Sequence, residues 1–131
     1  MEFALVIPVA LMLLLSLFDL GRAVYAYTTV SNAAREGARR AIVDQTSTSG
    51  VYAAQTEAAE SATALGIAPA SVTVSFLAPD LSGPCPTRDL GCVAVVTVPY
   101  QYTPATPIVN ILVGEIHLSS TVRIPIERTY P

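Results

Sequence analysis

The feature that most constrains this chain is an uncharged apolar run close to its N-terminus. Residues 3–18 read FALVIPVALMLLLSLF, with one Ser and no charged side chain. As an α-helix, this run would measure about 24 Å at 1.5 Å per residue. The hydrocarbon core of a bilayer is about 30 Å thick, so the run alone is slightly too short to span it. A membrane-spanning helix would therefore have to continue beyond residue 18.

The residues that follow allow such a continuation. Asp19 and Arg22 stand three residues apart, a spacing at which opposite charges pair on one helix face. Tyr25 and Tyr27 would then lie at the membrane–water boundary, where amphipathic rings are favoured. Pro8 fits a helix packed among other helices, because neighbouring helices can satisfy the backbone carbonyl that it leaves free.

Three interpretations of the apolar run compete. A cleavable signal peptide would begin with positive charge, whereas the only early charge is that of Glu2. A core helix of a soluble protein would need cover on all sides, and a chain of 131 residues has little to provide it. We therefore favour a membrane-spanning helix that also packs against other copies of itself. The residues expected at this assembly surface are Phe3, Pro8, Leu13, Leu14, Phe18, Asp19 and Arg22.

No proline interrupts residues 19–44, so the helix is expected to continue into water and to form one long segment over residues 1–44. A helix from residue 2 to about residue 44 would measure roughly 63 Å, and part of it must protrude from so small a protein. An apolar stripe at helical spacing follows the leucine run, with small residues beside it. Its members are Ala23, Tyr27, Val30, Ala34, Ala38 and Ala41. The small face, with Ala34, Gly37 and Ala38, would pack against the protein's own C-terminal part or against another subunit.

The remainder, residues 45–131, is expected to form an α+β head. A loop at 46–50 leads into a second helix at 51–65, which Gly66 would end. Alternating apolar residues at 71–77, 93–102 and 116–126 predict half-buried strands of a small antiparallel sheet. The aqueous part of the long helix is the obvious cover for its apolar face. Pro99 and Pro125 cannot donate to the ladder and should lie at edges or strand ends.

Two further segments carry specific expectations. Residues 103–115 combine two prolines with an apolar cluster, which would be core, or a patch against a neighbour or the bilayer surface; core is the commoner explanation. Cys85 and Cys92 flank a loop rich in proline and glycine, and we expect them to form a disulfide. The ring would stabilise the fold by about 2.5 kcal/mol on the chain-entropy model. A disulfide implies an extracytoplasmic location.

Composition leaves little material for catalysis. The net charge is −3 and the pI is about 4.9, which argues against nucleic-acid binding, and all seven cationic side chains are Arg. One His and two Cys are too few for a typical zinc site. His117, on the polar face of a strand, should be exposed and inert. We therefore expect no enzyme activity, no cofactor and no metal.

Motifs within residues 2–43 resemble the N-terminal signature of TadE-like proteins, which are pilin-like or pseudopilin subunits of the Tad branch of type IV pilus machinery. The matching features are the tripeptide EFA, Pro8, the leucine run, D-x-G-R at 19–22 and NAAREGAR at 32–39. The resemblance implies a type IV pilin-like fold, processing by a prepilin peptidase, insertion into the inner membrane and an external C-terminal domain. It also implies assembly by a pilus-type motor.

Glu2 has a specific meaning within this resemblance. Burying an unpaired carboxylate at the edge of an apolar bundle is costly. In pilin-like assemblies the matching glutamate pairs with a neighbour's N-terminal amine, which makes Glu2 a candidate for setting assembly register; the alternative is a solvated position among lipid headgroups. Family precursors carry a basic leader ending in Gly, whereas here Met1 directly precedes Glu2, so the cleavage point is not readable.

Three functions are compatible with the sequence. The leading hypothesis is a structural subunit of a helical homopolymer that moves from the membrane to the cell surface. The second is a minor pseudopilin that initiates or caps a Tad pilus or secretion filament. The third, from another class, is a single-pass membrane-anchored adhesin or binding domain.

Overall fold

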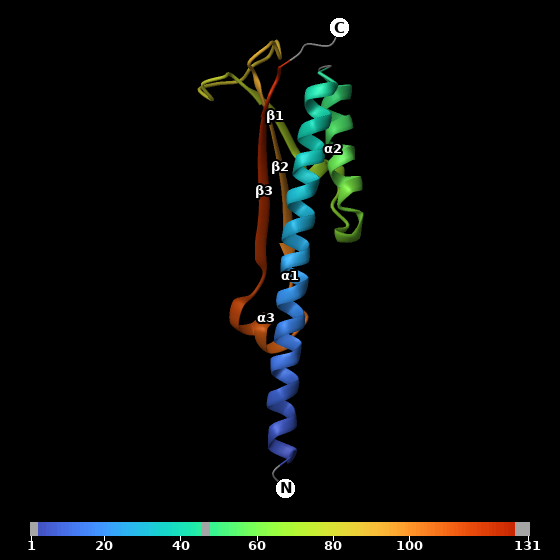
Figure 1. Ribbon diagram of the computed structural model, residues 1–131, viewed down its shortest axis with the longest axis vertical. Helices are drawn as coiled ribbons and strands as arrows, with labels where there is room; N and C mark the ends of the chain where they lie inside the picture. Colours follow the sequence, from blue (N-terminus) through green and yellow to red (C-terminus); the bar gives the residue numbers. More distant parts are fainter. Residues whose placement is uncertain (1–2, 46–47, 128–131) are drawn as a thin grey trace.

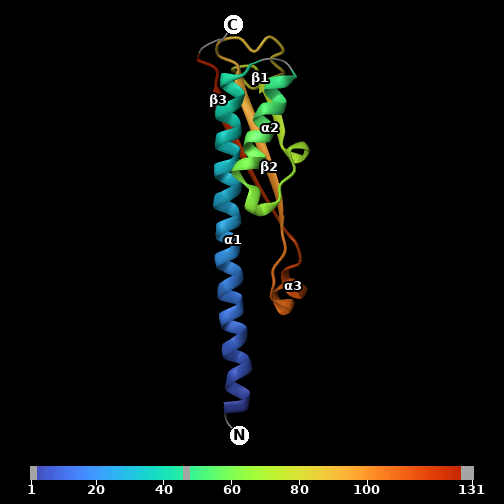
Figure 2. The same ribbon diagram turned by 90° about the vertical axis from the view of Figure 1, so that its right-hand side faces the viewer.

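The computed structural model describes residues 3–45 and 48–127 and shows an α+β protein built along one long helix (Figures 1 and 2). Its C-terminal half carries the sheet and the second helix, while its N-terminal half projects beyond them. This architecture confirms the predicted fold class. The elements in chain order are α1 (Phe3–Val43), α2 (Ser49–Ser61), η1 (Thr63–Leu65), η2 (Pro69–Ser71), β1 (Thr73–Leu77), β2 (Val93–Tyr102), α3 (Pro107–Val113) and β3 (Ile116–Pro125).

The helix α1 is continuous over 41 residues, as the lack of interior breakers predicts. Pro8 lies inside it without ending it. The second predicted helix corresponds to α2 followed by the 3₁₀ turn η1, and Gly66 ends it in the left-handed conformation with φ of 65°. The loop predicted at 46–50 is shorter than expected, because α2 already begins at Ser49; residues 46–47 lie outside the described part.

The three strands form an antiparallel sheet in the order β1-β2-β3. The central strand β2 is twice as long as β1, and its pairing with β1 ends at Thr97. Pro99 lies just beyond that point, paired only with Ser119 of β3, so its missing N–H faces no ladder partner. Pro125 is the last residue of β3. Both prolines therefore occupy the edge or end positions predicted for them.

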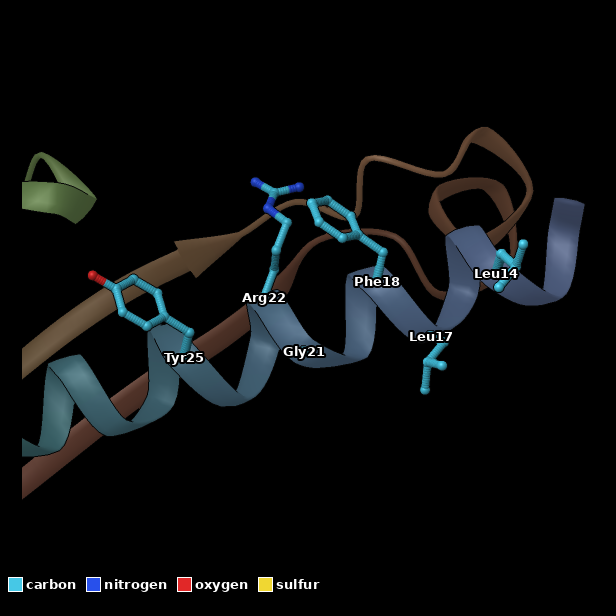
Figure 3. A pocket seen from close by; sticks show the side chains of 6 residues that line it. All are labelled: Leu14, Leu17, Phe18, Gly21, Arg22 and Tyr25. Carbon is cyan, nitrogen blue, oxygen red and sulfur yellow. The ribbon is translucent and has the colours of Figure 1, made fainter.

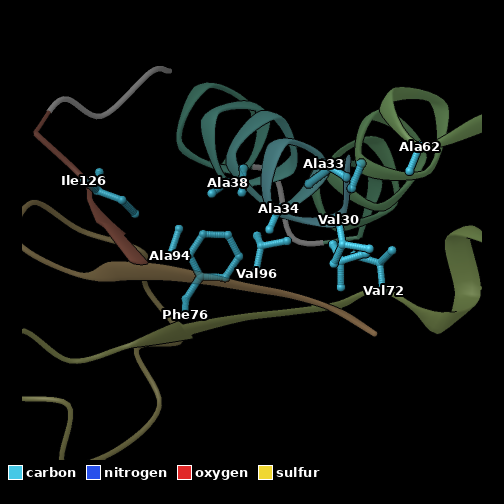
Figure 4. Packing of buried hydrophobic residues seen from close by; sticks show 14 of the residues in the cluster. Val30, Ala33, Ala34, Ala38, Ala62, Val72, Phe76, Ala94, Val96 and Ile126 are labelled. Carbon is cyan, nitrogen blue, oxygen red and sulfur yellow. The ribbon is translucent and has the colours of Figure 1, made fainter. Parts of the chain in front are cut away.

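A core of small side chains joins α1 and α2 to the sheet (Figure 4). On α1, Val30, Ala34, Ala38 and Ala41 are fully buried, as the stripe predicted. The predicted stripe was wrong at one residue, because Tyr27 is 55% exposed and Ala26 is buried instead. Ala33 is also fully buried, so the face of α1 that meets the head is turned toward Ala26 and Ala33, which lie seven residues apart on one side of the helix.

Gly37 marks the closest approach in this core. A Cβ added to it would lie 2.9 Å from Cβ of Ala58, 3.1 Å from the carbonyl oxygen of Ala54 and 3.2 Å from Cγ1 of Val96. Ala34, Gly37 and Ala38 are thus covered by the protein's own head. Of the two uses considered for the small-residue face, packing within the chain is the one observed.

The cysteines form the predicted disulfide, Cys85–Cys92, in the long connection between β1 and β2. Arg88, inside the ring, lies 4.3 Å from the centre of the Phe76 ring and donates a hydrogen bond of 2.8 Å to the carbonyl oxygen of Gln45. The bridged loop is therefore attached both to the sheet and to the chain that leaves α1.

Replacing Gly37 with Ala is expected to lower the free energy of unfolding by about 1–2 kcal/mol, because overpacking against rigid atoms exceeds the gain in helix propensity. Gly21→Ala is the matched control, since Gly21 lies in the same helix with nothing within 4 Å of the position that a methyl group would take. That variant should be neutral or more stable. Thermal unfolding in detergent measures both, and equal shifts would contradict the packing account.

The double variant Cys85→Ala/Cys92→Ala is expected to lose about 2.5 kcal/mol of unfolding free energy, because the unfolded chain gains loop entropy. Chemical denaturation in detergent measures the loss, and reduction of the unmodified protein should reproduce most of it. Reductant should leave the double variant unchanged. An unaltered denaturation midpoint in both cases would show that the ring contributes nothing.

Candidate assembly and membrane surface

Residues 6–18 of α1 are exposed around the whole circumference of the helix. Phe3 is 81% exposed, Leu13 68%, and Leu14 and Phe18 63% each. Within the described residues, α1 is the one helix long and apolar enough to cross a membrane. A helix with apolar side chains on every side is stable only with an apolar surrounding, either lipid or other helices. The predicted assembly residues Phe3, Pro8, Leu13, Leu14 and Phe18 therefore all lie on accessible surface, whereas Glu2 is outside the described part.

A shallow apolar hollow lies on this surface over Gly21, where the helix has no side chain (Figure 3). Phe18 and Arg22 project from α1 in the same direction beside it, and Leu17 points to the other side. Leu14 and Tyr25 complete its lining. A missing side chain between large ones gives a second helix or a lipid chain room to approach the backbone closely.

Asp19 is the exception on this half of α1, because it is only 4% exposed. Its two carboxylate oxygens accept hydrogen bonds from the backbone N–H groups of Ala105 at 2.9 Å and Thr106 at 2.8 Å. The Tyr102 hydroxyl donates to the Asp19 carbonyl oxygen at 2.8 Å. We call this set of contacts the Asp19 clamp. It joins α1 to a segment more than 80 residues away in the sequence.

The local sequence explains why these amides need a partner. Thr106 precedes Pro107, the first residue of α3, and has extended backbone angles, so its N–H takes no part in a helix. Pro104 stands just before Ala105. Thr106 is 5% exposed, so an unsatisfied N–H there would be costly. A carboxylate with two acceptor oxygens satisfies both donors at once.

Arg22 completes the arrangement, as the i, i+3 spacing predicted. One of its terminal nitrogens lies 3.7 Å from an Asp19 carboxylate oxygen, and its guanidinium lies 5.7 Å from the centre of the Tyr102 ring. The Arg22 side chain is 45% exposed while that of Asp19 is 5% exposed. The pair thus buries the anion and leaves the cation partly accessible.

The apolar cluster at 103–115 corrects one expectation. Core burial was the commoner explanation, but Ile111 is 86% exposed, Leu112 84% and Val113 55%. The short helix α3 joins β2 to β3 beyond the end of the sheet, beside α1 (Figures 1 and 2), and no described element covers its outer side. Val109 and Val113 line a small apolar hollow against Leu20 of α1.

Two further predicted residues, His117 and Pro8, lie where the sequence predicts them. His117 is exposed on β3. Pro8 lies within α1. Among the described residues, no group of three or more His, Cys, Asp or Glu side chains is placed to hold a metal ion. Sequence reasoning found the Asp19–Arg22 pair but missed the loop amides; the prolines that flank 105–106 were the available signal.

A long apolar helix that carries a small disulfide-bonded sheet domain fits a pilin-type protein with a membrane anchor. The family model that matches the chain is that of the TadE-like proteins, over residues 1–39. This match confirms the resemblance found in the sequence and suggests a Tad pilus-associated protein. It covers most of α1 and none of the sheet. No curated protein and no solved structure matched the chain.

Replacing Asp19 with Ala should leave the Ala105 and Thr106 amides without their acceptor. Local opening of the loop should become easier by about 2 kcal/mol, which corresponds to roughly thirty-fold faster amide exchange at these two positions. Hydrogen exchange followed by NMR in detergent measures this rate. The exchange rate in Asp19→Asn should lie between those of Asp19→Ala and the unaltered protein, because the Asn side chain keeps one acceptor oxygen. Asp89→Ala, at an exposed aspartate in the disulfide loop, is the control. Unchanged exchange in Asp19→Ala would show that the clamp does not hold the loop.

Proposed function

We propose that this protein is a structural subunit of a Tad-type pilus filament that polymerises through α1. The observation that carries the proposal is the division of α1 into two halves. The C-terminal half is packed on its own head through Val30, Ala34 and Ala38, while the N-terminal half has apolar side chains exposed on every side. The C-terminal half of α1 is already covered by the head, whereas its N-terminal half requires lipid or identical helices around it.

Polymerisation exchanges one apolar surrounding for another. Each Å² of apolar surface kept from water is worth about 25 cal/mol, so a helix leaving the bilayer must find neighbours on all sides. Met12, Leu13, Leu14 and Leu15 are consecutive exposed residues that point in different directions around α1 and would contact different neighbours. A subunit that uses one face to meet the opposite face of the next makes a heterologous contact, which extends into an open helical array. The heads would then lie on the outside.

Glu2 retains its proposed role in assembly register. A carboxylate entering an apolar helix bundle is stable only when paired, and the N-terminal amine of a neighbouring subunit offers the opposite charge. This pairing would favour one axial offset between adjacent helices. The unassembled subunit would reside in the inner membrane and be processed by a prepilin peptidase. The Tad assembly machinery would then move it to the cell surface. The proposal requires no catalytic residue, cofactor or nucleic acid.

Electron microscopy of material sheared from the cell surface, with the subunit identified by mass spectrometry, tests the proposal. Filaments in which this chain is the main component would support it. Filaments that contain it only in trace amounts would instead support a minor pseudopilin that initiates or caps the filament. Retention of all the protein in the membrane fraction would favour a membrane-anchored adhesin and would overturn the proposal.

Glu2→Gln is expected to lower the yield of sheared filaments by about ten-fold or more, because the partner amine is left unpaired in an apolar bundle. The variant should still enter the membrane, since it removes a charge. Glu60→Gln, at an exposed glutamate of α2, is the matched control and should give normal yield. Normal filament yield from Glu2→Gln would remove the register role while leaving polymerisation through α1 intact.

A further inference from the structure

The exposed side of α3 is not used by the proposed filament contact of α1. The segment 103–114 contains no charged residue, and its outer side presents Ile111, Leu112 and Val113 to the surroundings. Two neighbouring side chains that are each more than four-fifths exposed are unusual for a short helix of an aqueous domain. Such a patch indicates a surface that meets something apolar.

The Asp19 clamp fixes where this patch lies along α1. Because the amides just before α3 are bound to Asp19, α3 cannot lie far above or below that residue. The hollow between the two helices is lined by Ser16, Leu20 and Ala23 on the side of α1. In both views α3 lies beside the projecting half of α1, apart from α2 and β1 (Figures 1 and 2). The patch therefore shares the axial level of the last turns of the apolar run.

Because the clamp buries the Asp19 carboxylate, the apolar surface of α1 that is compatible with lipid becomes longer. Residues 3–18 alone would span about 24 Å, short of a hydrocarbon core of about 30 Å. With Asp19 buried and hydrogen-bonded, exposed apolar side chains continue on α1 at Leu20 and Val24. A span of residues 3–24 measures about 33 Å, which matches the bilayer. Tyr25 and Tyr27, both exposed, then mark its outer boundary.

We propose that α3 is a second membrane contact, inserting Ile111, Leu112 and Val113 among the lipid chains of the outer part of the bilayer beside α1. The occupant is lipid because the patch is continuous with the lipid-facing surface of α1 and lies at the same level. Arg22 remains compatible with this depth, since it is paired with Asp19 and its long side chain can reach the headgroups. Glu115 and His117, exposed beyond α3, would stay on the aqueous side.

Fluorescence quenching by lipid tests this contact in the full chain. Leu112→Cys is labelled with an environment-sensitive dye while the native disulfide stays oxidised, and the protein is inserted into vesicles of phosphatidylethanolamine and phosphatidylglycerol. A phosphatidylcholine brominated on the upper part of its acyl chain is the quencher. Phe18→Cys, on the apolar run beside Asp19 and therefore at the level of α3, is the positive control. Tyr52→Cys, 65% exposed on α2, is the negative control.

The label at 112 is expected to lose at least about half as much fluorescence as the label at 18, with the label at 52 unaffected. Adding Ile111→Asp and Val113→Asp should lower the quenching at 112 by roughly two-fold or more, because charge disfavours insertion. A label at 112 that behaves like the one at 52 would overturn the proposal. Shielding of position 112 only in assembled filaments would also overturn it, by assigning the patch to a neighbouring subunit. Because the vesicles require no polymer, the result is independent of the filament proposal.

Discussion

The structure depends on one continuous helix that has two different surroundings. Over its C-terminal half, α1 is built from small residues, and Gly37 lets α2 and β2 approach so closely that an added methyl group would meet Ala58 at 2.9 Å. That contact is specific in shape, because a close-packed core responds to a single methylene. Over its N-terminal half, the same helix carries large, flexible apolar side chains, most of which are more than half exposed. The C-terminal half fixes the head to the helix, and the N-terminal half leaves the helix available to lipid or to other subunits.

Asp19 lies at the junction of these two halves. A charged residue there would ordinarily end the apolar surface, but both oxygens of its carboxylate are bound to backbone amides of the loop before α3. The clamp therefore does two things at once. It removes the anion from the surface of α1, and it holds the far end of the sheet, through β2 and α3, against a helix that would otherwise project alone. The hydrogen bond from Tyr102 to the Asp19 carbonyl oxygen reinforces the same junction.

Much of this architecture could be predicted from the sequence, because its signals are local. The apolar run, the period of two in β2 and β3 and the position of Gly66 each depend on residues close together in the chain. The clamp could not be predicted, since it joins residues more than 80 positions apart and depends on which way a loop turns. Tyr27 was misplaced for a related reason: helical spacing identified the approximate side of α1, but the tertiary packing decides how far the buried face is turned toward Ala26 and Ala33. The exposure of Ile111 and Leu112 likewise depends on how the connection between β2 and β3 lies beside α1, which the alternating pattern does not reveal.

The two proposed surfaces place a joint demand on assembly. If α3 enters the bilayer beside α1, a subunit that leaves the membrane withdraws both from lipid together, because the clamp fixes their relative level. Neighbouring subunits must then cover the outer side of α3 as well as the circumference of α1, since exposing either to water costs about 25 cal/mol for each Å². A filament formed through the leucine run alone would leave Ile111 and Leu112 in water. The neighbour that replaces lipid around residues 14–20 must therefore also reach α3, which limits the axial offset between adjacent subunits more tightly than a smooth apolar helix would. On this argument, the clamp and the pairing proposed for Glu2 act at opposite ends of the same apolar segment to select one register.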